Sequence, residues 1–119
     1  MSDAMLDPNV IDTLRGLPSP DERGMLACIA ELFTRDSAAL VGQIVQAGAA
    51  GDWPALSAAA HALKSYAGNV GAAALAGQLR DLERAAKAGD ASACLALVAA
   101  VPAACAAVDA ALLAEVQRK

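Results

Sequence analysis

The stretch GAAGDWPALSAAAHALKSYAGNVGA, residues 48 to 72, contains one helix together with the signals that begin and end it. Gly48 or Gly51 suits the left-handed end of a preceding helix, and Asp52 suits the N-cap of the next one. Apolar residues then recur in alternating steps of four and three, the spacing of one buried helical face. They are Leu56, Ala60, Leu63, Ala67 and Val70. This pattern predicts an amphipathic helix that ends between residues 69 and 71.

The rest of the chain divides into helical segments in the same way. Asp7 and Pro8 resemble an N-cap and a first-turn proline, and they predict a short helix that ends near Gly16. Further helices are predicted over about residues 21–47, 72–88 and from 92 onward. Pro102 lies inside the last pattern and predicts a kink or a break, because proline removes a backbone donor. The expected buried positions are Leu26, Ile29, Phe33, Leu40, Ile44 and Ala47, then Leu75, Leu79, Leu82 and Ala86, then Val98, Val101, Cys105, Val108 and Leu112.

Composition favours the same fold class. Apolar residues make up 57% of the chain, much of this fraction is alanine, and the aromatic residues are limited to Phe33, Trp53 and Tyr66. Alanine has the highest helix propensity, and residues that favour strands are sparse. A chain of 119 residues suits one domain with one core. We therefore predict a single all-α domain over residues 1–119, an antiparallel up-down four-helix bundle with a short extra N-terminal helix laid across it.

Charge and hydropathy argue against several classes of function. Nine basic and thirteen acidic residues give a net charge of −4, and no basic run suggests nucleic-acid binding. No apolar stretch of transmembrane length is free of both charge and proline, and residues 1–10 lack the pattern of a signal peptide. We expect a soluble, cytoplasmic monomer that binds neither nucleic acid nor membrane.

The cysteines and the absent nucleotide motifs limit the chemistry further. Cys28, Cys94 and Cys105 are widely spaced among apolar residues, without a C-x-x-C pair. A single histidine cannot complete a tetrahedral zinc site with them without unusual help. We expect three reduced core thiols and no cofactor of the protein's own. Neither a Walker A motif nor a G-x-G-x-x-G loop is present, so we expect no catalytic ATP site.

His61 is the only histidine in the chain, and helical phase places it beside the buried stripe, about 100° from Ala60. The same outer strip contains Lys64 and a shelf of small residues. These are Ser57, Ser65 and Gly68. A neutral imidazole has one ring nitrogen free to act as a nucleophile, and a lysine one turn away can donate to a phosphoryl group.

This pairing suits phosphohistidine chemistry. It suits hydrolysis poorly, because no carboxylate-oriented pair of serine and histidine can be identified. The alternative is an exposed histidine without a role.

The string HALKSYAGNVGA, residues 61 to 72, closely resembles the signature of histidine-containing phosphotransfer (HPt) domains. In that family a histidine is followed by any residue, a hydrophobe, lysine and several small residues, with a hydrophobe before Gly-Ala at the helix end. The resemblance extends over most of the chain through four shorter strings. They are LDPNVIDTL at residues 6–14, ELF at 31–33, AGDW at 50–53 and LRDLERAAKAGD at 79–90.

The resemblance implies a phosphorelay carrier in two-component signalling. Such a domain accepts a phosphoryl group from the receiver domain of a hybrid histidine kinase and passes it to the aspartate of a response regulator. By this resemblance His61 is the phosphoryl acceptor, Lys64 supports the phosphoryl oxygens, and Gly68 and Gly71 are small motif residues. The magnesium needed for transfer is expected in the acidic pocket of the partner receiver.

Two positions depart from the family pattern. Ser65 stands where the family most often has glycine, and its hydroxymethyl group either tightens clearance or adds a hydrogen bond. Tyr66 stands where a small residue is usual. By helical phase Tyr66 lies on the flank away from His61, so we expect it to pack in the bundle with its hydroxyl at the edge.

In some family members a side chain from the following helix hydrogen-bonds the histidine, and the equivalent position here is Glu83. A carboxylate that accepts from one ring N–H leaves the other nitrogen free to attack. The alternative is that Glu83 only pairs with Lys87 at i+4. The two interpretations have equal weight.

Two competing functions share the helical architecture. The phosphoacceptor segment of a histidine kinase usually has an acidic residue after its histidine and a proline a few positions on. Here Ala62 follows His61, and the next proline is Pro102, which disfavours autophosphorylation. The other alternative is an HPt-like interaction domain that binds a receiver without carrying phosphate. An apolar docking patch around the histidine would serve either a carrier or an interaction domain, and we predict it at Val10, Ile11, Leu14, Met25 and Leu26.

Overall fold

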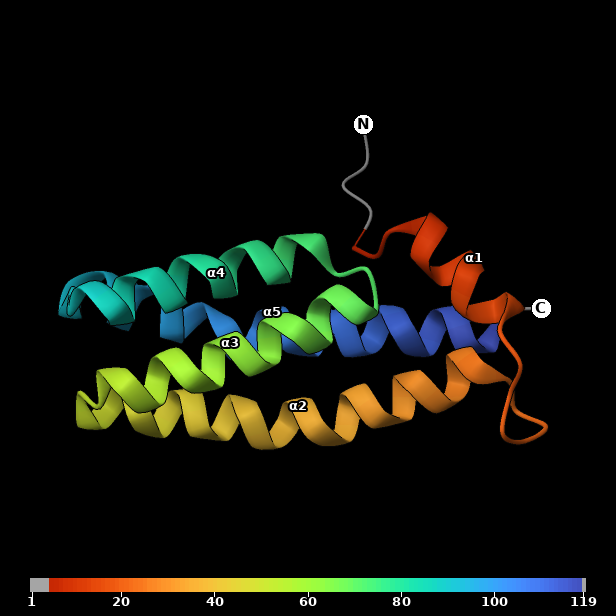
Figure 1. The fold of residues 1–119 in the computed structure, drawn as a ribbon, viewed down its shortest axis with the longest axis horizontal. Coiled ribbons are helices and arrows are strands. Elements are labelled where there is room, and N and C mark those ends of the chain that lie inside the picture. Colours follow the sequence, from red (N-terminus) through yellow and green to blue (C-terminus); the bar gives the residue numbers. More distant parts are fainter. Residues whose placement is uncertain (1–4, 119) are drawn as a thin grey trace.

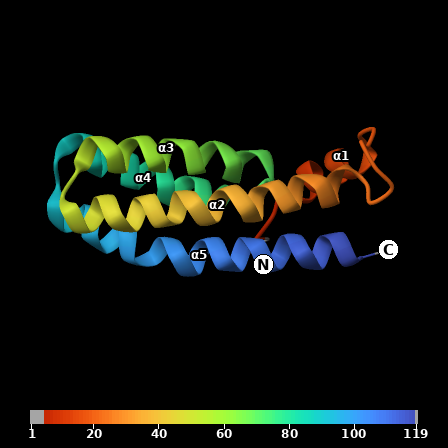
Figure 2. The same ribbon diagram turned by 90° about the horizontal axis from the view of Figure 1, so that it is seen from below.

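The computed structural model describes residues 5–118, and their secondary structure is entirely helical. The helices are α1 (Pro8–Gly16), α2 (Met25–Ala50), α3 (Trp53–Asn69), α4 (Ala73–Ala88) and α5 (Ala91–Gln117). In the bundle α2 and α4 each pack on both α3 and α5, so α2 and α4 are diagonal to each other (Figures 1 and 2). The predicted fold, an antiparallel four-helix bundle with a short extra N-terminal helix, is confirmed.

Most helix ends follow the predicted capping residues. The Asp52 carboxylate accepts from the Ala55 backbone N–H at 3.2 Å, and Asp7 accepts from the Asn9 N–H at 2.9 Å. Gly51 ends α2 in the left-handed conformation, with φ of 68°. The predicted start of α2 near residue 21 is wrong, because Gly24, with φ of 96°, interrupts the chain and the helix begins at Met25.

The core forms where the predicted apolar faces of the four long helices meet. The predicted positions of α3, α4 and α5 are all buried, and in α2 the exceptions are Ile29 and Leu40, which are half-buried. Ser37 is a buried polar residue that the pattern did not predict, and its hydroxyl donates to the Thr34 carbonyl at 3.3 Å. That bond satisfies the hydroxyl within its own helix, so the residue is tolerated in the core.

Helix α5 runs through Pro102 without interruption, so of the kink or break predicted at this proline, the break is wrong. Pro102 is exposed, and the helix contacts α2 and α4 on its other side. Among the described residues, α5 is the one helix long and apolar enough to cross a membrane by length and composition. Here its apolar stripe, from Cys94 to Leu112, is buried in the bundle core.

The cysteines do not share one environment. Cys94 and Cys105 are buried free thiols, as predicted, and burial raises the pKa of both. Cys28 is only half-buried, which corrects the prediction of three core thiols. Its sulfur lies 3.6 Å from both carboxylate oxygens of Asp21 in the turn before α2. Cys28 therefore lies beside the polar turn that precedes α2, not in the core.

Helix α1 closes one end of the bundle. The Asp7 N–H donates to the Gly71 carbonyl at 2.8 Å, and Arg15 pairs with Glu115 of α5 at 3.0 Å. Ile11 is buried beneath the helix. Gly71 has φ of 75°, and a Cβ there would lie 3.0 Å from the Val10 Cβ and 3.1 Å from the Asp7 nitrogen. The turn between α3 and α4 therefore needs glycine for both its conformation and the close contact with α1.

We expect Gly71→Ala to lower the free energy of unfolding by about 2 kcal/mol, because it combines a left-handed alanine with a backbone contact that is too close. Gly68→Ala is the matched control, since this glycine is helical and its Cβ would meet nothing within 4 Å. It should raise the free energy of unfolding by roughly 0.5–1 kcal/mol. Urea unfolding followed by circular dichroism measures both values, and equal effects would show that the turn does not depend on Gly71.

Candidate functional site

His61 lies on the outer face of α3, and 63% of its side chain is exposed. Ala60 and Leu63 hold the helix against the core, which places His61 beside the buried stripe as predicted. Ser65 and Gly68 are exposed next to it, and the space above Gly68 is open. The imidazole therefore rises from a low surface that another protein can approach.

Glu83 of α4 lies against the imidazole with its side chain only 10% exposed. Its Oε2 is 3.1 Å from His61 Nδ1, and its Oε1 accepts from Lys64 Nζ at 2.8 Å. Lys87 Nζ also pairs with Oε2, at 3.1 Å. The expected contact with the imidazole and the i+4 pair with Lys87 are therefore both present, so Glu83 does not pair with Lys87 alone.

The lysines set the charge of Glu83. The Lys64 hydrogen bond, opposed by burial and aided by Lys87, lowers the pKa of the Glu83 carboxyl from 4.5 to about 2. At neutral pH Glu83 is thus ionised and can only accept hydrogen bonds. The neutral imidazole must then carry its hydrogen on Nδ1, which leaves the lone pair on Nε2. This arrangement holds one tautomer of His61, with its nucleophilic nitrogen free of Glu83.

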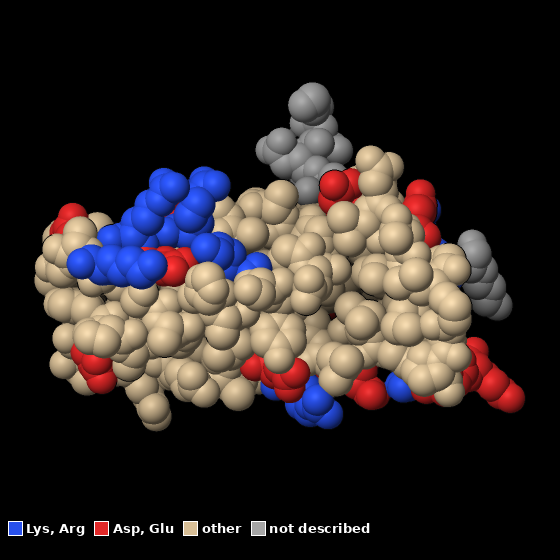
Figure 3. All heavy atoms as spheres, in the orientation of Figure 1, with Lys and Arg blue, Asp and Glu red and all other residues tan. Residues whose placement is uncertain are grey.

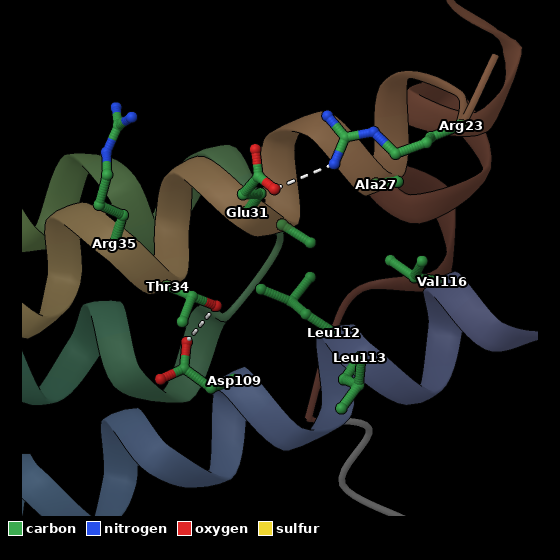
Figure 4. A pocket seen from close by; sticks show the side chains of 10 residues that line it. Arg23, Ala27, Glu31, Thr34, Arg35, Asp109, Leu112, Leu113 and Val116 are labelled. Atoms are coloured by element: carbon green, nitrogen blue, oxygen red, sulfur yellow. Dashed lines mark hydrogen bonds and ion pairs between the residues drawn. The ribbon is translucent and has the colours of Figure 1, made fainter. Parts of the chain in front are cut away.

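The surface beside His61 is an open hollow of about 430 Å³. Its lining residues are Pro54, Ser57, Ala58, His61, Glu83 and Lys87. A separate pocket lies between α2 and α5, where Thr34 donates to Asp109 at 3.2 Å and Leu113 forms part of the apolar wall (Figure 4). Within residues 5–118, no group of three or more His, Cys, Asp or Glu side chains is placed to hold a metal ion.

The two departures from the family pattern have different surroundings. The Ser65 hydroxyl donates to the His61 carbonyl of its own helix, at 3.4 Å, so it is directed at the backbone. The Tyr66 hydroxyl donates to the Asp36 carboxylate of α2 at 2.9 Å, while its ring packs on the core. The predicted position of Tyr66, in the bundle and away from His61, is confirmed.

The predicted apolar docking patch is wrong in part. Ile11 and Leu26 are buried in the core, and Val10, Leu14 and Met25 are only half-buried. Helix α1 lies over the turn after α3 (Figure 1). Gly71 in that turn follows His61 by roughly three helical turns of sequence. These residues therefore do not surround the imidazole, because their apolar side chains are used to close the end of the bundle.

Sequence reasoning missed the basic side chains that α4 adds to this face. Arg80 and Arg84 flank Glu83 in sequence, and Lys and Arg side chains gather over α4 and the adjoining part of α3 (Figure 3). The spacing of Arg80, Arg84 and Lys87 places them on one side of the helix, which was a usable signal. It was not visible as a basic run, because acidic and apolar residues separate the three.

Protonation of Glu83 in acid should lower the free energy of unfolding. Its stabilising contribution is present above pH 4.5 and is lost as the pH falls toward its folded pKa of about 2. A shift of this size corresponds to a loss on the order of 3 kcal/mol. Glu83→Gln should therefore show a flatter decline of the free energy of unfolding across this window than the wild type, measured by urea unfolding at successive pH values.

Asp81→Asn is the control, because Asp81 is exposed and its nearest ion-pair contact, to Arg80, is 3.9 Å. Its acid profile should follow that of the wild type. Parallel curves for Glu83→Gln and the wild type would show that the cluster around Glu83 contributes no stability.

Comparison with known proteins agrees with this geometry. The profile of the Hpt domain family matches residues 29–111. The solved structure of histidine-containing phosphotransfer protein B (HptB) from Pseudomonas aeruginosa PAO1 is similar over 99% of both chains, with 29% sequence identity and a TM-score of 0.86. Curated protein sequences contain no significant match. Because the profile covers well over half of the chain and the structural likeness covers nearly all of it, the chain belongs to the Hpt domain family, the phosphotransfer carriers of two-component signalling.

Proposed function

We propose that His61 is the phosphoryl acceptor of a phosphorelay, charged by a receiver-domain aspartate of a hybrid histidine kinase and discharged to the aspartate of a response regulator. The observation that carries this proposal is the contact of 3.1 Å between His61 Nδ1 and the ionised Glu83 carboxylate. It directs the lone pair to Nε2 on an exposed imidazole. A nucleophile positioned in this way suits a carrier, which needs positioning more than chemical machinery.

The transfer step balances without a base on this chain. The Nε2 lone pair attacks the phosphorus of the aspartyl phosphate, the bond from phosphorus to the aspartate oxygen breaks, and aspartate leaves as a carboxylate. The proton on Nδ1 stays hydrogen-bonded to Glu83, which stabilises the positive charge that the imidazole gains. Discharge to a second aspartate is the reverse reaction. Magnesium, bound in the acidic pocket of the receiver, would neutralise phosphoryl charge during transfer.

Lys64 and Lys87 have two effects in this mechanism. Their ion pairs keep Glu83 charged, and they place two ammonium groups beside the imidazole. An ammonium group can donate to phosphoryl oxygens without blocking Nε2. Lys64 lies on the same helix as His61, one turn away, so we assign it the main support of the phosphoryl group.

The geometry argues against a kinase acceptor site. Autophosphorylation from ATP is helped by a carboxylate base next to the histidine, but α3 contains no acidic residue. The carboxylate that contacts the imidazole, Glu83, has a pKa of about 2 and is therefore a weak base. An interaction domain that carries no phosphate is the remaining alternative, although it would not need a selected tautomer of an exposed imidazole.

Ser65 is compatible with transfer. Its hydroxyl is directed at the His61 carbonyl, so the substitution for glycine adds a hydroxymethyl group to the surface beside His61 but no charge.

We propose that the protein is cytoplasmic, as its receiver partners would be. The free, buried thiols of Cys94 and Cys105 suit a reducing compartment.

The carrier proposal predicts acid-labile phosphate on the wild type after mixing with a radiolabelled, phosphorylated receiver domain. His61→Gln should take up no label, because the nucleophilic nitrogen is gone, while its melting curve stays close to that of the wild type. Gel autoradiography before and after acid treatment measures the phosphate. A folded wild type that no receiver labels, although it binds one, would establish the interaction-only alternative.

Lys64→Ala should slow transfer by at least tenfold, since one phosphoryl-supporting cation is lost. Its free energy of unfolding should fall by only about 1 kcal/mol, because Lys87 still pairs with Glu83. Single-turnover transfer kinetics and urea unfolding measure the two effects. Arg118→Ala at the far end of α5 is the control and should leave the rate unchanged. Unchanged transfer with a large loss of stability would assign Lys64 to structure.

A further inference from the structure

The face around His61 is basic on an otherwise acidic protein. Lys64 on α3 and Arg80, Arg84 and Lys87 on α4 are accompanied there by two carboxylates, Glu83 and Asp81. The chain has nine Lys and Arg and thirteen Asp and Glu, so five basic and eleven acidic residues remain elsewhere. Figure 3 shows this concentration of Lys and Arg over one part of the molecule.

Stability does not explain the two arginines. Arg84 has no ion-pair partner among residues 5–118, and Arg80 has only its exposed neighbour Asp81, at 3.9 Å. Like charges at i and i+4 on a helix repel each other and slightly destabilise it. Two like charges therefore stand one turn apart on α4, and the only ion pair that either makes within residues 5–118 is the long contact of Arg80 with Asp81.

Arg80 and Arg84 lie close to the proposed phosphoryl site. Arg80 precedes Glu83 by three residues and Arg84 follows it by one, so both lie within about one turn of the carboxylate that contacts His61. Helical phase places Arg80 and Arg84 further outward than Glu83. A protein that covers the imidazole from outside therefore also meets this side of α4.

We propose that Arg80, Arg84 and Lys87 form an electrostatic docking stripe for the acidic face of a receiver domain, and that their charge sets the rate of association and the choice among receivers. This inference rests on the proposed function, which makes a receiver the partner of His61. A receiver offers carboxylates around its phosphorylated aspartate, and opposite charge on two approaching surfaces steers their encounter. Arg80 and Arg84 act before phosphoryl transfer and Lys64 acts during it, while Lys87 belongs to the stripe and also pairs with Glu83.

A nucleic acid is a poorer match for the same charges. The stripe consists of three side chains on one helix, and aromatic residues for base stacking are missing from α4. The net charge of −4 repels a polyanion over the remaining surface. The observations therefore favour a protein partner with a local acidic face.

The double variant Arg80→Gln/Arg84→Gln tests the stripe while leaving His61, Lys64, Glu83 and Lys87 in place. Stopped-flow association with a receiver domain that exchanges phosphate with the wild type should be about tenfold slower at low ionic strength. The difference should shrink as salt is added, because salt screens exposed charges. Both positions are exposed and glutamine is a good helix former, so the variant should melt at or slightly above the wild-type temperature.

Arg35→Gln/Arg118→Gln is the matched control. It removes the same charge from α2, which is diagonal to α4, and from the residue after α5. Its association rate should stay within about twofold of the wild type. Equal slowing by the two double variants would overturn the stripe, because net charge alone would then explain the effect.

Phosphorylation of His61 by phosphoramidate, a small donor that needs no docking, separates this proposal from the proposed function. Equal labelling of the wild type and the stripe variant, with slower labelling of the variant by the receiver, supports the stripe. Wild type that neither phosphoramidate nor any receiver labels contradicts the proposed function itself. Salt-sensitive binding of duplex DNA by the wild type that the stripe variant loses would overturn the assignment to a protein partner.

Discussion

The central interaction of this molecule is the ionised carboxylate of Glu83, which is nearly buried between α3 and α4. Its oxygens lie within hydrogen-bond distance of the His61 imidazole and form ion pairs with Lys64 and Lys87. A nearly buried carboxylate without partners would be costly, and two ammonium groups offset that cost here. The same contacts join two helices and direct the histidine lone pair outward. Stability and chemistry thus share one side chain.

The bundle supplies this site with a rigid base rather than with a cavity. Ala60, Leu63 and Ala67 are fully buried, so the rotation of α3 about its axis is determined by the core. That rotation places His61 at the edge of the core, next to α4. Because the imidazole is exposed and Ser65 and Gly68 beside it are small, the proposed transfer leaves the remaining reacting groups to the partner protein. A carrier of this kind needs no pocket of its own.

Two regions of the surface have separate roles. The end of the bundle is closed by α1, which buries Ile11 and leaves Val10 and Leu14 half-buried. The face near His61 instead combines small residues of α3 with cations of α4. Apolar contact and charge are therefore divided between the end and the side of the bundle. This division favours recognition of the partner through charge at the side.

Much of the architecture was predictable from local pattern. Stripes with helical spacing predicted most of the core residues, and Asp52, Gly51 and Asp7 predicted helix ends, because capping and periodicity depend on residues close in sequence. The HPt signature singled out His61 and Lys64 as candidate site residues in the same way. Three of the predictions that failed involve the docking patch near Ile11, Cys28 and the start of α2, and these three depend on how α1 and the turn before α2 fold back on the bundle. The break predicted at Pro102 failed separately, on the exposed side of α5.

What the tertiary structure alone decided is the relation between helices. The sequence left open whether Glu83 contacts His61 or only pairs with Lys87 at i+4. The pair with Lys87 is local to α4, whereas the packing of α3 beside α4 brings the Glu83 carboxylate within 3.1 Å of His61 Nδ1. The grouping of Arg80 and Arg84 with Lys64 follows from the same packing. Spacing along a helix is local, whereas the side of α4 that meets α3 depends on how all the buried stripes fill one core.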